Sequence, residues 1–177
     1  FFHHYLKENS QTDAGLPEAM MYDTGKKEWK EFTNYPPKHA QKINFYLANG
    51  TLNKNPSASF SEYYSDPNNP VLSSDNLKDF NGFTPRNYMS EDQRFALGRP
   101  DVLTFTTEPL KEDLTFGGEI MAKLNIASTS TDADFAVKLI DVYPEDFVPK
   151  EKKDGVIYGN YHQMVRSEIM PARFRNS

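Results

Sequence analysis

Carboxylates are concentrated in one stretch of the sequence, TDADFAVKLIDVYPEDF, residues 131–147. Five acidic side chains flank or interrupt its apolar run: Asp132, Asp134, Asp141, Glu145 and Asp146. Two acids at alternate positions could open a calcium loop, but an EF-hand needs a third oxygen ligand at the next alternate position, where this chain has Ala136. We therefore favour a turn followed by a strand, with Asp132 and Asp134 accepting hydrogen bonds from nearby backbone amides.

The other three acids of this stretch are also expected to be structural. Asp141 lies inside the apolar run, so it faces either solvent or a partner on a neighbouring strand such as Lys123. Glu145 and Asp146 follow Pro144 and indicate a solvated loop. Spacing alone does not test an acid pair for glycoside cleavage, because such carboxylates converge in space. The sequence singles out no catalytic residue, no cofactor-binding residue and no metal ligand.

Nucleophilic catalysis has no support from motifs. The chain lacks the G-x-S-x-G elbow of the α/β-hydrolases, and it has no cysteine that could act as a thiolate. Its four histidines are His3, His4, His39 and His162. His3 and His4 are adjacent, so on a helix they point about 100° apart and do not serve one site easily. For His162 a surface or packing role is the favoured interpretation.

Aromatic residues offer a second class of function. Exposed rings on a β-sandwich could form a platform for sugar stacking, with these candidates: Trp29, Tyr35, Tyr46, Tyr63 and Tyr64. Packing in a core or against another domain is the favoured alternative. The tripeptide Asn49-Gly50-Thr51 matches the glycosylation sequon, which is too short a match to carry weight.

Composition predicts an all-β domain. The 177 residues include 13 Phe and 10 Tyr, which bury large areas, and 12 Pro and 9 Gly, which divide the chain into short elements. The net charge of −5 comes from mixed signs without a basic stripe, so we expect no nucleic-acid partner. No apolar run approaches the ~20 residues that span a bilayer, so we expect no membrane partner. The absence of cysteine leaves the cellular compartment undecided.

Periodicity places the elements that would carry these residues. We expect the last turns of a helix at 1–10 and a hairpin at 17–32, whose loop is Asp23–Lys27. A long, ordered loop follows at 52–87, with one short strand at 59–63, and a short helix at 90–98 with a Ser90–Gln93 capping box. Further strands are expected at 43–50, 101–107, 119–129 and, as a central strand, 135–143.

Alternation within these strands predicts which side chains are buried. Lys123 should be exposed, and the core should contain these residues: Ile120, Leu124, Ile126, Phe135, Val137, Leu139 and Ile140. Truncation of a buried leucine such as Leu124 to Ala would then cost about 2–5 kcal/mol.

Several segments together resemble one enzyme group. EDQRFALGRPDVLTFTTEPL (91–110), GGEI (117–120) and ASTSTDADFAVKLIDVYPED (127–146) are similar to the C-terminal domain of the Xaa-Pro dipeptidyl-peptidase, cocaine esterase, glutaryl-7-aminocephalosporanic acid acylase and α-amino-acid ester hydrolase family. FFHHYLK (1–7) resembles the last helix of the α/β-hydrolase domain in that group. MMYDTGKKEWKEFTNYPP (20–37) resembles the first hairpin after that helix.

The resemblance implies a fold and a function. The fold would be a jelly-roll, galactose-binding-like β-sandwich with long loops and one or two short helices. Residues 1–16 would be the helix end and linker, and 17–177 the C-terminal domain, cut short after MPARFRNS. The catalytic Ser, Asp and His of the family precede this region, so no triad position carries over to a residue here.

The resemblance also implies a partner and a source. The chain would be the non-catalytic domain of a bacterial serine hydrolase, packing on its own upstream α/β-hydrolase domain and shaping the active-site entrance. A homo-oligomer is a further partner that this role would allow. The location, periplasmic or secreted or else cytoplasmic, stays open. The alternative is a stand-alone carbohydrate-binding β-sandwich module.

Overall fold

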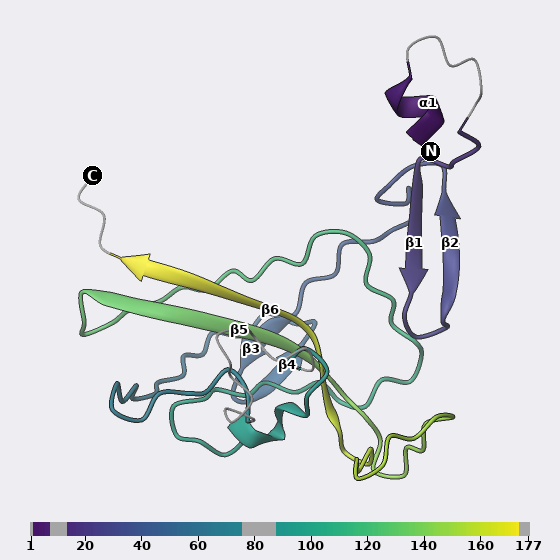
Figure 1. Cartoon of the computed structure of the whole chain (residues 1–177). Coiled ribbons are helices and arrows are strands. Elements are labelled where there is room, and N and C mark those ends of the chain that lie inside the picture. Colours follow the sequence, from purple (N-terminus) through teal and green to yellow (C-terminus); the bar gives the residue numbers. More distant parts are fainter. Residues whose placement is uncertain (1, 8–13, 76–87, 174–177) are drawn as a thin grey trace. The chain divides into compact units, whose positions relative to one another are not determined.

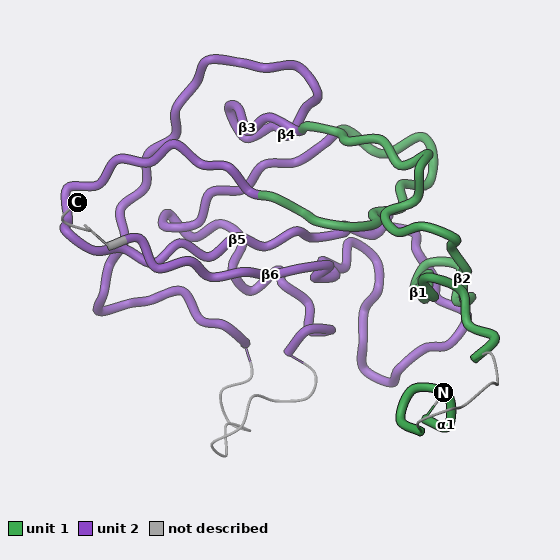
Figure 2. The backbone as a smooth tube through the Cα atoms, turned by 90° about the horizontal axis from the view of Figure 1, so that it is seen from above, with its two compact units in different colours: residues 1–44, 108–121 green, residues 45–107, 122–177 purple. Residues whose placement is uncertain are grey.

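Strands are the most frequent regular element of the structure (Figure 1). The structure is a computed structural model that describes residues 2–7, 14–75 and 88–173. Contacts group the chain into two compact units. Unit 1 contains residues 1–44 and 108–121, and unit 2 contains 45–107 and 122–177 (Figure 2). In the described ranges, each strand pairs antiparallel with one other, which makes three two-stranded sheets. The boundary expected at residue 16 stays a prediction.

Unit 1 contains the predicted hairpin. Strand β1 (Ala19–Asp23) pairs with β2 (Glu28–Phe32), with Tyr22 opposite Trp29. The Asp23 carboxylate organises the turn, because its Oδ1 accepts hydrogen bonds from the backbone amides of Gly25 and Lys26 at 3.1 and 3.0 Å. Its Oδ2 accepts from Lys30 Nζ at 2.6 Å.

Unit 1 also contains a short helix, α1 (Phe2–Leu6). This helix agrees with the helical turns predicted at the start of the chain. Their expected end at Asn9 and Ser10 lies outside the described residues.

Unit 2 begins with a tight hairpin. Strand β3 (Tyr46–Ala48) pairs with β4 (Thr51–Asn53), and Ala48 lies opposite Thr51. The two residues between them, Asn49 and Gly50, have φ angles of 49° and 73°. Asn-Gly is the dipeptide that favours such a two-residue turn. The predicted strand at 43–50 is therefore confirmed only for Tyr46–Ala48, since the chain turns at Asn49.

The longest sheet of unit 2 is formed by β5 (Asp132–Val142) and β6 (His162–Arg173), which lie side by side in Figure 1. Their register shifts between Leu139 and Ile140, where Val165 becomes an extra residue of β6. In the part of the chain that the structure describes, β5 pairs with β6 alone, so the prediction of a central strand at 135–143 is wrong.

A short 3-10 helix, η2 (Gln93–Ala96), packs near the start of β6 and marks the best buried part of unit 2. The buried residues of the described ranges are Ala48, Tyr161, Met164, Ser74 and Gln93. The helix predicted at 90–98 is confirmed as this shorter element, but its cap differs. The N-cap is Asp92, whose side chain accepts from the Arg94 amide, and the Gln93 side chain turns instead toward Glu91 O and Lys138.

The all-β class is confirmed, because strands predominate and helix is minimal among the described residues. Three predicted strands do not form there. Residues 101–107 make a single bridge, Thr106 to Thr51, and residues 59–63 and 119–129 are not in a ladder. Alternation sets which side chains share a face, but a strand also needs a neighbour to complete its hydrogen bonds.

The predicted core of these strands is wrong for four residues. Ile120, Leu124, Ile126 and Val137 are 38–51% exposed, because no described sheet covers their apolar faces. Three other residues, Phe135, Leu139 and Ile140, are half-buried on β5. Lys123 is exposed, as predicted. The large cost expected for Leu124→Ala does not follow from this position, since exposed side chains cost little to replace.

Candidate functional site

The acidic stretch is a strand followed by a loop, but the strand begins at Asp132. The prediction that Asp132 and Asp134 lie in a turn before the strand is therefore wrong, because both belong to β5. Asp132, Asp134 and Asp141 are exposed on β5, and within the described ranges none of them forms an ion pair. The neighbour of Asp141 across the sheet is Gln163, so the suggested Lys123 partner is wrong. Glu145 lies in an exposed turn after β5.

The loop after β5 is closed by its own backbone. Tyr143 N donates to Tyr161 O at 2.9 Å, and Asn160 N donates to Pro144 O at 3.2 Å. The Tyr143 ring contacts Phe147 and Tyr161, with centroid distances of 4.5 and 5.9 Å. Residues 144–160 therefore form a loop whose two ends are held together.

The four histidines belong to two different units. His3 and His4 lie on α1 and His39 lies in an exposed segment, all in unit 1. His162 begins β6 in unit 2, where its backbone N–H donates to Asp92 Oδ1 at 3.3 Å. This half-buried position fits the favoured surface or packing role of His162.

The densest polar network joins η2 to the β5–β6 sheet. Asp92 Oδ2 accepts from Arg94 Nε at 2.7 Å, and Asp92 also forms a backbone bridge with Gln163. Tyr161 donates its hydroxyl proton to Ser90 O at 2.5 Å, and Gln163 Nε2 donates to Met89 O at 3.2 Å. The bonds of Tyr161 and Gln163 connect residues 71 and 74 positions apart in the sequence.

Lys138 completes this network from the middle of β5. Its Nζ donates to Gln93 Oε1 at 2.6 Å and lies 5.2 Å from the centroid of the Phe95 ring. The Gln93 side chain is almost fully buried, so Lys138 supplies the proton donor that its buried oxygen needs. Sequence reasoning missed this pair, because Lys138 looked like one polar residue in an apolar strand.

Burial shifts the pKa values of this network. It lowers the pKa of Lys138, and the Glu91 carboxylate only partly opposes this. It lowers the pKa of His162, which Asp92 opposes and Arg94 reinforces. Burial also raises the pKa of Tyr161. Burial alone would raise the pKa of Asp92. Hydrogen bonds from Arg94 and His162 outweigh this effect and hold that pKa below its ordinary value.

Perturbed pKa values often mark active sites, but the side chains of Lys138, Asp92 and Tyr161 are committed to structural bonds. The network contains no serine or cysteine nucleophile placed against a base. Across residues 2–7, 14–75 and 88–173, no three His, Asp or Glu side chains are grouped in a way that could hold a metal ion. We infer that the network fastens η2 to the sheet.

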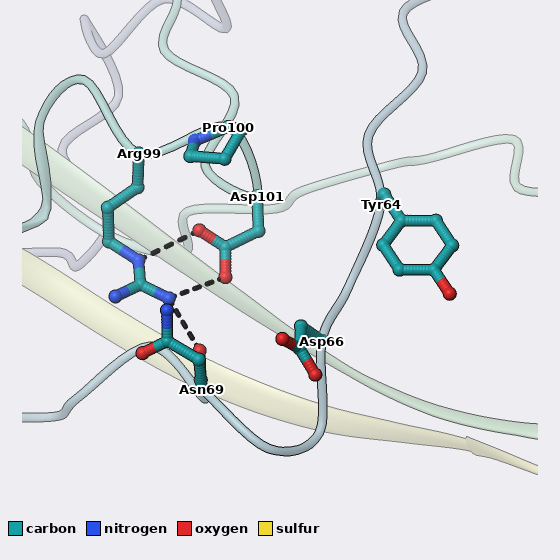
Figure 3. A pocket seen from close by; sticks show the side chains of 6 residues that line it. All are labelled: Tyr64, Asp66, Asn69, Arg99, Pro100 and Asp101. Carbon is teal, nitrogen blue, oxygen red and sulfur yellow. Dashed lines mark hydrogen bonds and ion pairs between the residues drawn. The ribbon is translucent and has the colours of Figure 1, made fainter.

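A cleft of about 320 Å³ lies elsewhere in unit 2 (Figure 3). Its walls are Tyr64, Asp66, Asn69, Arg99, Pro100 and Asp101. Arg99 Nε and Nη2 donate to the two carboxylate oxygens of Asp101 at 2.8 and 2.7 Å, and Nη2 also donates to Asn69 O at 2.6 Å. This fork lowers the pKa of Asp101.

The sequence contained a signal for this fork. Arg99 and Asp101 are two residues apart around Pro100, and alternate residues of an extended segment point to the same side. The RPDVL motif contributed only to the family resemblance, and its ion pair was missed.

The rings of the proposed aromatic platform belong to two different units. Trp29 and Tyr35 belong to unit 1, where Trp29 contacts Tyr22 and Tyr35 OH accepts from Gly118 N at 2.8 Å. The other three rings belong to unit 2, and of these Tyr64 lines the cleft, with 83% of its surface exposed. Among the described residues, no helix is long and apolar enough to cross a membrane.

Residues 12–175 match the model of one protein family, described as the X-Pro dipeptidyl-peptidase C-terminal non-catalytic domain. The chain belongs to this family. That membership confirms the resemblance found in the sequence.

Two relatives of this X-Pro dipeptidyl-peptidase C-terminal domain support its membership of the family. It is 32% identical over 158 residues to a cocaine esterase from Rhodococcus sp. (strain MB1 Bresler), covering 82% of this chain and 27% of that one. It superposes on an aminopeptidase from a marine sediment Thaumarchaeota archaeon with a TM-score of 0.70 and 30% identity, covering 97% of this chain and 28% of that one.

The chain therefore spans just over a quarter of the length of either relative. As a member of a non-catalytic domain family, it is related to one part of a larger hydrolase in each case. One relative comes from Rhodococcus and the other from an archaeon, so a bacterial source for this chain stays a prediction.

Proposed function

We propose that this chain packs on the catalytic α/β-hydrolase domain of its own polypeptide and helps to shape the entrance to the active site. The observation that carries the proposal is the small share of each related hydrolase that this chain covers. A domain of a non-catalytic family that matches 27–28% of two hydrolases needs a catalytic partner for the chemistry. The stand-alone module is less well supported, because the family is one of C-terminal domains.

The β1–β2 hairpin offers a face for this contact. Alternation and register put Met20, Tyr22 and Trp29 on one side of the hairpin. They are 41, 47 and 64% exposed, and the Tyr22 and Trp29 rings contact each other edge to face at 5.3 Å. Trp, Tyr and Met are enriched at protein interfaces, where large, rigid side chains contribute most of the binding energy.

The chemistry belongs to the partner domain. A serine would attack the amide or ester carbonyl, a histidine would accept its proton, and water would release the acyl group from the enzyme. This chain contributes surface to that reaction and no reacting group. Peptides, acyl amides and esters all remain candidate substrates, as the names of the related enzymes suggest.

The test uses the natural polypeptide that contains this sequence. Trp29→Ala should lower the midpoint of thermal unfolding of the catalytic domain and reduce kcat/KM for p-nitrophenyl acetate, because the docking face loses its largest ring. Lys26→Ala, in the exposed turn of the same hairpin, is the control. If Trp29→Ala and Lys26→Ala match the wild type in both measurements, this face does not dock on the catalytic domain.

A further inference from the structure

The groups that line the cleft of unit 2 differ in how many further hydrogen bonds they can make to a ligand. The Arg99–Asp101 fork is a fixed wall, because each partner satisfies the other and Asp101 is only 7% exposed at its side chain. Asp66 keeps one carboxylate oxygen without a hydrogen bond among the described residues, since only Oδ1 accepts, from Asn68 N at 2.9 Å. The Asn69 side-chain amide supplies a donor and an acceptor beside it.

Tyr64 adds a flat apolar surface to these polar groups. Its ring lines the cleft and is 83% exposed, so neither face is covered by a neighbouring side chain to any great extent. Figure 3 shows this ring and the Asp66 carboxylate across from the Arg99–Asp101 fork. A ring beside hydrogen-bonding groups suits a ligand that is apolar on one face and polar at its edge.

Charge narrows the class of ligand. Arg99 and Asp101 neutralise each other, which leaves the Asp66 carboxylate as the net charge of the walls. An anion would be repelled by the Asp66 carboxylate, because the Arg99 guanidinium is already paired with Asp101. A cation would gain little, because an exposed carboxylate contributes at most about 1 kcal/mol to an ion pair and Arg99 lies nearby. A neutral ligand with several hydroxyl groups meets donors and acceptors without either penalty.

The volume of the cleft agrees with a neutral ligand that carries several hydroxyl groups. Ligand pockets begin at about 300 Å³, and this cleft of about 320 Å³ would hold one sugar ring. We propose that the cleft binds a neutral saccharide unit, with the sugar ring stacked on Tyr64 and its hydroxyl groups bonded to Asp66 and Asn69. This inference is independent of docking on a catalytic domain, because all six walls belong to unit 2.

Saturation-transfer difference NMR on the natural polypeptide tests the proposal. The probes are methyl α-D-glucopyranoside, methyl α-D-mannopyranoside and methyl β-D-galactopyranoside. At least one should give a saturable signal with a dissociation constant of about 1 mM, as expected for a small, open site. Tyr64→Ala and Asp66→Ala should each weaken that binding about tenfold, because stacking or hydroxyl bonding is lost.

Tyr63→Ala is the matched control, since Tyr63 is the adjacent aromatic residue and does not line the cleft. It should change the dissociation constant less than about twofold. Three results would each overturn the proposal: no saturable signal from any glycoside, equal binding in Tyr64→Ala and the wild type, or binding of methylguanidine or glucose 6-phosphate where the glycosides fail. The thermal midpoint of each variant shows that it is folded.

Discussion

At the residue scale, the most instructive side chain is Lys138. A lysine in the middle of a half-buried strand would normally be costly, because desolvation penalises its charge. Here the ammonium group has a carbonyl oxygen at 2.6 Å and an aromatic ring at 5.2 Å. Lys138 stabilises the fold because it donates a hydrogen bond to the side-chain oxygen of Gln93, which is buried away from water.

Replacing Lys138 with Met should therefore destabilise the chain although Met suits a strand interior. Gln93 would keep a buried oxygen without its donor, which costs about 1–3 kcal/mol of the free energy of unfolding. Urea denaturation measures the change. Lys123→Met, at an exposed position, is the control and should stay within about 0.5 kcal/mol. Equal effects of the two substitutions would show that the Gln93 contact is not stabilising.

His162 should make stability depend on pH. Burial lowers its pKa in the folded chain below the 6.5 of an unfolded histidine. Between these two values the unfolded state binds more protons, so the free energy of unfolding falls as the pH is lowered from 6.5 through the folded pKa.

Urea denaturation from about pH 7.5 down to about pH 5 checks this expectation for His162. His162→Asn should flatten the slope just below pH 6.5, and His39→Asn, which removes an exposed histidine, is the control. An unchanged slope in His162→Asn would assign the pH dependence to other groups.

At the element scale, the loop between β5 and β6 depends on close approach of two backbone segments. A Cβ at Gly159 would collide with the carbonyl group of Glu145. That carbonyl cannot move freely, because the neighbouring bonds Tyr143 N to Tyr161 O and Asn160 N to Pro144 O close the loop. Only glycine fits this position without opening it.

Gly159→Ala should consequently cost about 1–3 kcal/mol in the free energy of unfolding, as overpacking usually does. Gly25→Ala is the control, since its Cβ would meet only the Asp23 carboxylate at an ordinary contact distance. Thermal unfolding compares the two. A midpoint for Gly159→Ala that equals that of Gly25→Ala would mean that the loop relaxes at no cost.

At the scale of the whole molecule, exposed apolar surface and unpaired strand edges favour association. In the described ranges β5 pairs on one side only, and large apolar residues of the sheet, Ile169 and Met170, are 60 and 68% exposed. Such edges and patches recruit other chains. Phe2, Tyr5 and Leu6 of α1 are exposed as well.

The 177-residue chain should therefore self-associate when it is studied without a catalytic domain. Light scattering over a concentration series should show a mass that rises into the high micromolar range. Val165→Lys and Ile169→Lys, which place charges on β6, should shift the series toward the monomer. A constant monomer mass would show that these surfaces need no partner.

The same chain should not turn over activated esters or Xaa-Pro amides. The reason is the missing nucleophile elbow and the family's non-catalytic description. Incubation with a serine-directed fluorophosphonate, followed by mass spectrometry, checks this expectation. Stoichiometric labelling of one serine, together with loss of p-nitrophenyl acetate turnover, would contradict it.

The sequence by itself determined the class, the family and the local turns. Aromatic-rich, proline-divided composition indicated β structure, and Asp23 to Lys27 indicated the first hairpin, because turn chemistry acts over a few residues. The order of RPDVL, TDADF and KLIDVYP along the chain is specific enough to identify the family. Asn49-Gly50 is an equally local turn signal, and the strand predicted at 43–50 ran through it.

Tertiary structure alone decided which side chains meet. Periodicity put Leu124 on an apolar face but could not supply a sheet to cover it, so the residue is 41% exposed. Lys138 bonds to Gln93, 45 residues away in the sequence, and Tyr161 bonds to Ser90, 71 residues away. At such separations in the sequence, the spacing of residues does not predict which of them are in contact. The cleft has the same origin, because Tyr64 and Arg99 come from separate loops whose approach depends on the folded chain as a whole.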